Sequence, residues 1–284
     1  METINPITLD KAIELVPAIN ATSAAHNVSD RYQFVSTRSI LEKVQEYGWQ
    51  ITNATAQGSS PFAQHRVTLV HENDFRKPEA HKEGIPRIEM FNSHNRTKRL
   101  MFAIGFFRFV CSNGLIVASG PMETIRTKHR FSGDRLSVIM EQVSQISSRF
   151  PKILSKIEDF RSRQLNENEQ KAYAEYAIRG RFNYRPEMPK RFQDVNRVSE
   201  HLLDSRREED NGNSAWQVYN RVQENLIRGV EGFTRPIRGY SDSVRVNQLL
   251  WKGAEATLDF QSEGLSKALT QLLVKDGKKG KIAA

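Results

Sequence analysis

The chain has 284 residues, enough for one large domain or two modest ones, and its 38% hydrophobic and 26% charged residues exclude a collagen-like or wholly disordered chain. Its apolar runs are too short to span a membrane and its acidic N-terminus is unlike a signal peptide, so we expect a cytoplasmic protein with no membrane partner. A net charge of +9 makes it basic, and its single cysteine, Cys111, excludes an internal disulfide and a multi-cysteine zinc site.

Two helices are expected before the first strand. Apolar residues recur at helical spacing after Thr8, which is suited to cap a first helix. The polar stretch 18–31 is predicted to be an arm or linker. A second helix follows, with Ser36 or Thr37 as its N-cap and its end at Gly48.

Alternating apolar and polar residues then predict strands. The clearest candidates are 49–53, 65–71, 87–92 and 125–131. The first two are separated by Gly58-Ser-Ser-Pro61, which is typical of a turn.

The segment 106–117 allows two interpretations. Asn113-Gly114 is the preferred residue pair for a type I′ turn and is flanked by β-branched and aromatic residues, which favours a hairpin. A helix that ends at an Asn-Gly C-cap is the alternative.

A heptad seam follows Gly133. Its members alternate in steps of four and three, and they are Ile139, Val143, Ile146, Phe150, Ile153, Ile157 and Phe160. Pro151 should kink or split this helix. A long core helix packed on the sheet is favoured over an intermolecular coiled coil, although the seam would also allow a homo-oligomer.

Further helices are expected after the seam. Asn166 is predicted as an N-cap with Glu169 as its capping-box partner. After a polar loop at 205–213, apolar stripes predict helices over 215–226 and 246–258, and the lysine-rich segment 275–281 is predicted to be flexible. Arginines on these helices are interpreted as ion-pairing or surface residues, namely Arg221, Arg228 and Arg245.

This order of elements predicts an α+β fold, with an antiparallel sheet in the N-terminal half packed against a mainly helical C-terminal half. We divide the chain into four parts on this basis. They are an N-terminal helix and arm (1–31), a strand-rich core (32–133), a helical part packed on the core (134–272) and a flexible basic tail (273–284).

The basic excess lies in the middle of the chain. The net charge is −2 over residues 1–95, +8 over 96–163 and +3 over 164–284. The cations of the middle segment form two clusters, Arg96, Lys98 and Arg99 with Arg108, and Arg126, Lys128 and Arg130 with Arg135. Such clusters are typical of a polyanion-binding surface, and a positive surface kept for solubility is the alternative.

Five separated blocks resemble, in the expected order, a family that phages and plasmids carry, domain of unknown function 932. The blocks are 32–37 with Gly48-Trp49, 92–94, 107–115, 220–229 and 245–251, so the resemblance covers about residues 30–255. It implies a mobile-element protein of the bacterial cytoplasm and implies no reaction. A helix before Gly-Trp, followed by strands beside a basic segment, gives a weaker resemblance to the single-strand annealing proteins of phages and eukaryotes.

A metal-dependent nuclease is the third functional candidate. His65, His71 and His94 lie on or near predicted strands, but the carboxylates of such a site have no recognisable spacing, and turn chemistry also explains 92–95. Motifs of ATPases, dehydrogenases and zinc proteases are missing from the sequence. We therefore expect no catalytic residue, no metal and no cofactor.

Binding to a single strand requires cations for the phosphates and an aromatic face for the bases. If 101–111 is a strand, Phe106 and Arg108 share a face and form a candidate stacking pair, and a buried position is the alternative for Phe106. The predicted nucleic-acid-binding residues are Arg96, Lys98, Arg99, Phe106, Arg108, Arg126, Lys128 and Arg130.

The sequence thus leads us to expect a protein that binds single-stranded nucleic acid, with DNA favoured, and that serves as a recombination or annealing accessory. The alternative is a non-catalytic protein-interaction or assembly protein.

Overall fold

The computed structural model describes residues 5–28, 32, 34–76, 84–108, 111–116, 135–182 and 195–282. By its internal contacts the chain divides into two compact units, Met1–Phe150 and Pro151–Ala284. The described part of the first unit contains an antiparallel sheet and that of the second is helical. The α+β class predicted from the sequence is therefore confirmed.

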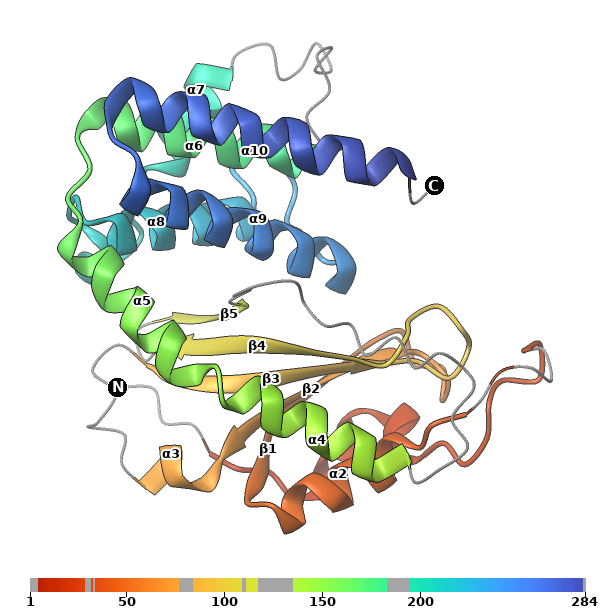
Figure 1. The fold of residues 1–284 in the computed structure, drawn as a ribbon. Coiled ribbons are helices and arrows are strands. Elements are labelled where there is room, and N and C mark those ends of the chain that lie inside the picture. Colours follow the sequence, from red (N-terminus) through yellow and green to blue (C-terminus); the bar gives the residue numbers. More distant parts are fainter. Residues whose placement is uncertain are drawn as a thin grey trace. The chain divides into compact units, whose positions relative to one another are not determined.

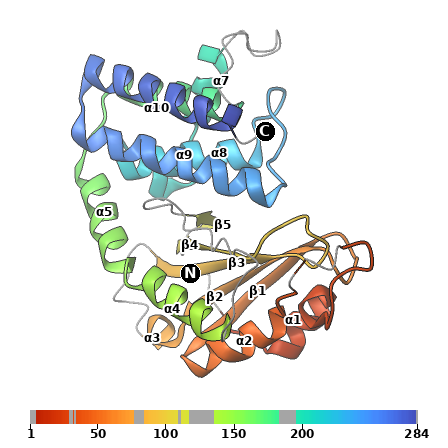
Figure 2. The same ribbon diagram turned by 45° about the vertical axis from the view of Figure 1, so that its right-hand side comes forward.

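The N-terminal unit is built on one sheet (Figure 1). Its strands, each antiparallel to the next, are β1 (Trp49–Gln57), β2 (Gln64–His71), β3 (Ile85–Asn92), β4 (Met101–Arg108) and β5 (Cys111–Ile116). The helices of this unit are α1 (Leu9–Leu15), the 3₁₀ turn η1 (Pro17–Asn20), α2 (Thr37–Glu46), α3 (Glu72–Arg76) and α4 (Arg135–Ser147). Figure 2 shows α1 and α2 against one face of the sheet.

The predicted helix starts are confirmed. The Thr8 hydroxyl accepts a hydrogen bond from the backbone N–H of Lys11 (3.1 Å), and the Ser36 hydroxyl accepts one from Ser39 (3.2 Å). Gly48, with φ +83°, follows α2 and turns the chain into β1.

The two faces of the sheet differ in character. The face toward the helices carries buried apolar residues, namely Val67, Leu69, Ile88, Met90, Phe102, Ile104 and Phe106. The opposite face carries Glu89, whose carboxylate lies 2.6 Å from Arg87 Nε and accepts a hydrogen bond from the Thr68 hydroxyl (2.9 Å). Glu89 is fully buried, so its charge needs these partners.

The hairpin interpretation of 106–117 is confirmed, but the predicted position of its turn is wrong. β4 and β5 pair with Arg108 opposite Cys111, and residues 109–110 between them lie outside the described ones. Asn113-Gly114 lies within β5, where the register shifts between the Phe106–Leu115 and Arg108–Cys111 pairs. The Asn-Gly pair therefore marks an irregularity in the ladder and not the hairpin turn. The strand predicted at 125–131 also lies outside the described residues.

Pro151 divides the heptad seam as predicted, into α4 and α5 (Phe150–Ser162). All seven seam residues are 8% exposed or less, so the seam is buried. The helix α4 contacts α2 and β4, and the Phe150 ring packs edge-on against Trp49. These contacts lie within the N-terminal unit, which extends to Phe150.

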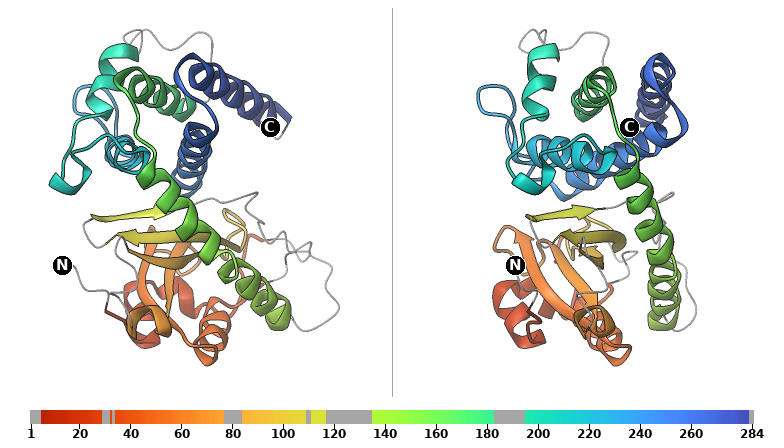
Figure 3. Two further views of the ribbon diagram at one scale, coloured as in Figure 1. Left: turned by 60° about the vertical axis from the view of Figure 1, so that its left-hand side comes forward. Right: turned by 90° about the vertical axis from the view of Figure 1, so that its left-hand side faces the viewer.

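The second unit consists of helices and connecting loops in its described part. The helices are α5, α6 (Glu167–Arg181), α7 (Val195–Leu202), the 3₁₀ turn η4 (Glu208–Asp210), α8 (Ala215–Arg228), α9 (Tyr240–Asp259) and α10 (Ser262–Ile282). Figure 3 shows α10 beside α6. A Cβ atom on Gly253 of α9 would lie 2.4 Å from the Tyr176 ring, so glycine permits the close approach of α6 and α9.

The C-terminal segment is helical. Residues 275–281, whose predicted flexibility stays a prediction, continue α10 to Ile282. The helix begins with a buried stripe of Leu265, Leu269 and Leu273, and the lysine-rich segment extends it beyond that stripe. Packing of the first turns stabilises the helix, and the lysine-rich composition of its C-terminal end did not indicate a helix there.

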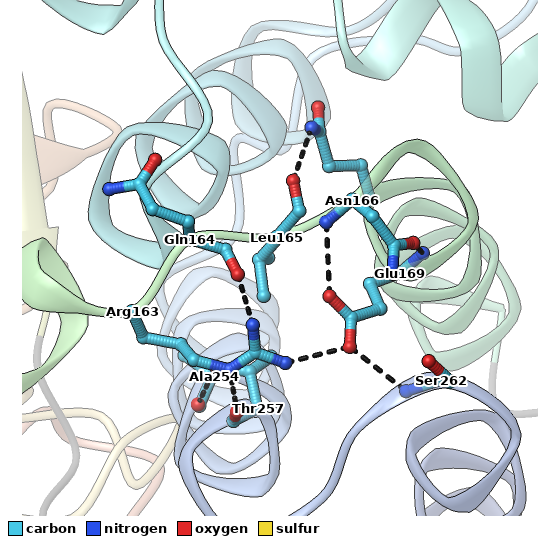
Figure 4. A network of polar contacts seen from close by, with 9 residues as sticks. Arg163, Gln164, Leu165, Asn166, Glu169, Ala254, Thr257 and Ser262 are labelled. Atoms are coloured by element: carbon cyan, nitrogen blue, oxygen red, sulfur yellow. Dashed lines mark hydrogen bonds and ion pairs between the residues drawn. The ribbon is translucent and has the colours of Figure 1, made fainter.

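A polar network joins three segments of the helical unit (Figure 4). Glu169 accepts hydrogen bonds from the backbone N–H groups of Asn166 (3.0 Å) and Ser262 (2.9 Å), and its carboxylate lies 2.7 Å from Arg163 Nη2. Asn166 Oδ1 in turn accepts from the Glu169 N–H (3.0 Å), which confirms the predicted capping box. Arg163 also donates to the Thr257 carbonyl (2.9 Å), so the network connects the starts of α6 and α10 to the end of α9.

Candidate nucleic-acid interface

The residues between β3 and β4, here called the basic loop (93–100), lie at one end of the sheet, where β3 ends and β4 begins (Figure 1). The Ser93 hydroxyl accepts a hydrogen bond from the Lys98 N–H (2.7 Å) and donates to the Lys98 carbonyl (2.8 Å). Gln64, at the start of β2, donates to the Thr97 carbonyl (3.3 Å). These bonds close the basic loop and hold it against the neighbouring strand.

The tip of the basic loop is a tight turn. Asn95 Oδ1 accepts hydrogen bonds from the backbone N–H (3.2 Å) and the hydroxyl of Thr97. Arg96 has φ +63°, a left-handed conformation that non-glycine residues seldom adopt. These hydrogen bonds therefore fix the backbone conformation from which the Arg96 side chain extends.

Arg96 and Arg99 are exposed, and among the described residues neither side chain has a hydrogen-bond or ion-pair partner. Lys98 is half-buried, its Nζ lies 5.8 Å from the centre of the Phe91 ring, and burial lowers its pKa. The segments 47–71 and 90–108 contain no Asp or Glu. Glu89 of β3 is fully buried and paired with Arg87, so the strands of the sheet add no exposed carboxylate near the basic loop, which favours a positive local potential.

A buried network lies beneath the basic loop. The Thr37 hydroxyl lies 2.9 Å from His65 Nε2, 3.3 Å from His94 Nε2 and 3.0 Å from Asn92 Nδ2. These four side chains, from α2, β2, the end of β3 and the start of the basic loop, are at most 3% exposed. We call them the Thr37 network.

The three contacts of the Thr37 hydroxyl match in donor and acceptor when both imidazoles are neutral. His65 Nδ1 donates to the Ala63 carbonyl (2.9 Å), so His65 Nε2 accepts the Thr37 hydroxyl hydrogen. The Thr37 oxygen then accepts from Asn92 and from His94 Nε2, which uses both of its lone pairs. Burial lowers the pKa of His65, an effect partly offset by the Ala63 carbonyl. Burial and the neighbouring His65 ring lower the pKa of His94 to about 4.

These pKa shifts predict that the N-terminal unit loses stability as the pH falls below the ordinary histidine range. The unfolded chain binds a proton on His94 near pH 6.5 and the folded chain only near pH 4, so stability rises with pH between these values. We expect His94 alone to reduce the free energy of unfolding by ~2 kcal/mol between about pH 7.5 and about pH 5. Hydrogen-exchange protection of β2 and β3 amides measures it, with His94→Gln as the non-titrating control. An equally steep pH dependence in His94→Gln would contradict the assignment.

The structure does not bring all the predicted site residues together. Arg108 ends β4, at the opposite end of a strand of roughly 20 Å from the basic loop. Phe106 is 1% exposed because it aligns with Ile104 and Phe102 on the face toward the helices, so the predicted stacking pair of Phe106 with Arg108 is wrong. The remaining predicted cations lie outside the described residues, and they are Arg126, Lys128 and Arg130.

The three candidate metal-ligating histidines are also not together. His65 and His94 have ring centres 5.3 Å apart in the Thr37 network. His71 lies at the far end of β2, where it contacts the Tyr47 carbonyl (3.2 Å) and the Trp49 ring. Among the residues that the structure describes, no group of three or more His, Cys, Asp or Glu side chains could hold a metal ion.

Arginines of the helical unit have internal partners, as the sequence predicted. Arg221 donates to Gln170 (3.1 Å), and Arg228 Nε lies 3.2 Å from a carboxylate oxygen of Glu224. Arg245 donates to the carbonyls of Gly180 and Arg181 (2.8 Å each) and so caps the C-terminus of α6. These groups stabilise helix packing.

Comparison with known proteins places the chain in a family. The family described as Domain of unknown function (DUF932) matches residues 24–251. The chain belongs to this family. Two proteins of Escherichia coli (strain K12), the UPF0380 proteins YafZ and YfjQ, are each 29% identical to it over 268 residues, which cover 89% of this chain and 92% of each relative. No solved structure matches the chain significantly.

Two of the blocks that carry the DUF932 resemblance meet in the Thr37 network. Thr37 ends the block 32–37, and Asn92 and His94 form the block 92–94. The Tyr32 hydroxyl adds a hydrogen bond to the Ser93 carbonyl (3.0 Å). The blocks therefore support the base of the basic loop, which the sequence alone did not indicate because the residues lie up to 61 positions apart.

In the described part of the chain, no helix combines the length and apolar character that a membrane span requires.

Proposed function

We propose that this DUF932 protein binds single-stranded nucleic acid, with DNA favoured, through its basic loop. The observation that supports this proposal is a hydrogen-bonded loop with two exposed arginines, Arg96 and Arg99, in a part of the sheet without exposed carboxylates. Arginine is suited to phosphate because its guanidinium donates paired hydrogen bonds in a fixed geometry. Contacts to the phosphates of the nucleic acid make the binding affinity strongly dependent on salt and give little preference for sequence.

The role that we propose is that of a recombination or annealing accessory encoded by a phage or plasmid and acting in the bacterial cytoplasm. A protein that captures strands through their phosphates holds them without reading their sequence. This property suits an accessory that must accept any strand. The uneven charge along the chain, with +8 over residues 96–163, supports electrostatic capture.

The double variant Arg96→Ala/Arg99→Ala tests the site. Each phosphate contact to a single strand contributes about 0.7 to the slope of log affinity against log salt, so losing two should reduce the slope by about 1.4. Filter binding of a labelled single-stranded oligonucleotide at several salt concentrations measures it. Lys171→Ala/Arg235→Ala is the matched control, since it removes two exposed positive charges from the helical unit. An unchanged slope in the first variant, or an equal loss in the control, would refute this site.

A further inference from the structure

The proposed interface requires an aromatic face beside its cations, because base stacking provides much of the affinity for unpaired strands. Phe106 cannot provide this face, since it is buried toward the helices. Phe91 is 1% exposed and lies beneath Lys98.

Phe62 lies in the turn between β1 and β2, at the same end of the sheet as the basic loop. Its backbone N–H donates to the Ser60 hydroxyl (3.2 Å), and its carbonyl accepts from the His94 N–H (3.1 Å). His94 also belongs to the Thr37 network and lies two positions before Arg96. One set of hydrogen bonds thus holds both the Phe62 turn and the cations.

The Phe62 side chain is partly exposed, and among the described residues its ring has no aromatic or cationic neighbour. Two other aromatic residues near the loop contact the loop itself. The Phe34 ring packs 4.9 Å from the His94 ring, and the Tyr32 hydroxyl donates to the Ser93 carbonyl. Phe62 is therefore a partly exposed aromatic ring at this end of the sheet, and it makes no ring contact with another described residue.

We infer that Phe62 is the stacking platform for an unpaired nucleobase whose adjoining phosphates bind Arg96 and Arg99. The inference rests on the proposed function and extends it to a named base-contacting residue. Stacking on a phenyl ring accepts any base, which agrees with capture that does not depend on sequence. The ligand class is single-stranded nucleic acid, since the bases of a duplex are already stacked on one another.

Phe62→Trp tests the stacking directly by fluorescence. The natural tryptophans Trp49, Trp216 and Trp251 are 4%, 2% and 0% exposed, so an indole at position 62 reports on the interface. We expect a dT oligonucleotide to quench the added emission, with a titration that follows filter binding. Tyr47→Trp is the matched control, because Tyr47 is 55% exposed at the end of α2, beside His71 at the other end of β2. Its emission should not change.

Phe62→Leu separates stacking from packing, since leucine keeps an apolar side chain but has no aromatic face. We expect it to lower affinity about tenfold with an unchanged salt slope, because no charge is lost. Circular dichroism of each variant verifies the fold. If the wild-type chain binds through Arg96 and Arg99, but Phe62→Trp is not quenched or Phe62→Leu binds normally, the inference is wrong and the proposed function stands. If the wild-type chain binds no oligonucleotide, both are wrong.

Discussion

Thr37→Val is expected to destabilise the N-terminal unit by about 3 kcal/mol, although valine has nearly the same shape. The substitution removes the hydroxyl shared by His65, His94 and Asn92 and leaves three buried polar side chains without this partner. Each buried group that loses its hydrogen bond costs roughly 1–3 kcal/mol. Lower hydrogen-exchange protection of β2 and β3 amides would measure the loss.

Thr37→Ser is the matched control for this prediction. Serine keeps the hydroxyl and loses one buried methyl group, so it should cost about 1 kcal/mol. We also expect Thr37→Val to weaken binding to a single-stranded oligonucleotide, because Asn92 and His94 hold the base of the basic loop. Equal protection in the valine and serine variants would show that the hydroxyl does not organise this network.

Local sequence patterns predicted most of the described secondary structure. Thr8, Ser36 and Asn166 act as N-caps through hydrogen bonds that span three residues, so the spacing of residue types is sufficient to find them. Pro151 divides the seam for an equally local reason, since it removes a backbone donor within a helix. The fold class followed from the order of these elements.

The position of the β4–β5 turn could not be predicted in the same way. Asn113-Gly114 satisfies the local preference for a tight turn, but the register of β4 against β3 and β5 places the pair within a strand. The same register turns Phe106 toward the helices. Strand register depends on neighbours distant in sequence, and a shift of one residue exchanges the two faces of a strand.

Part of the candidate site could be predicted from local sequence, and part depends on contacts between distant segments. Charge clustering alone identified Arg96, Lys98 and Arg99, which the structure places on one loop. The same clustering grouped Arg108 with them, although a full strand separates it from the basic loop. The Thr37 network and the turn of Phe62 depend on contacts between segments about 30 or more residues apart, which residue spacing does not encode.

Glu169→Ala is expected to destabilise the helical unit by about 3 kcal/mol. The change leaves the half-buried Arg163 without its carboxylate and removes the acceptor of two backbone N–H groups, those of Asn166 and Ser262 (Figure 4). Burial would raise the pKa of Glu169, but the Arg163 guanidinium and the two N–H donors lower it below the ordinary value, so the carboxylate is charged at neutral pH. Removing one partner of a buried ion pair costs about 3–5 kcal/mol, and the partial exposure of Arg163 places this pair at the lower end.

The loss should appear first where the network ends, at the start of α10. Ser262 has φ +47°, an unfavourable conformation for a residue with a side chain, and its N–H bond to Glu169 helps to hold it. We expect hydrogen-exchange protection to fall in the first turns of α6 and α10. Glu169→Gln is the control: its amide oxygen can still accept from the Ser262 N–H and from Arg163, while the charge and the acceptor of the Asn166 N–H are lost, so protection at the start of α10 should fall by less than half as much. If glutamine and alanine were equally destabilising, the ion pair with Arg163 and not the backbone contacts would hold α10 in place.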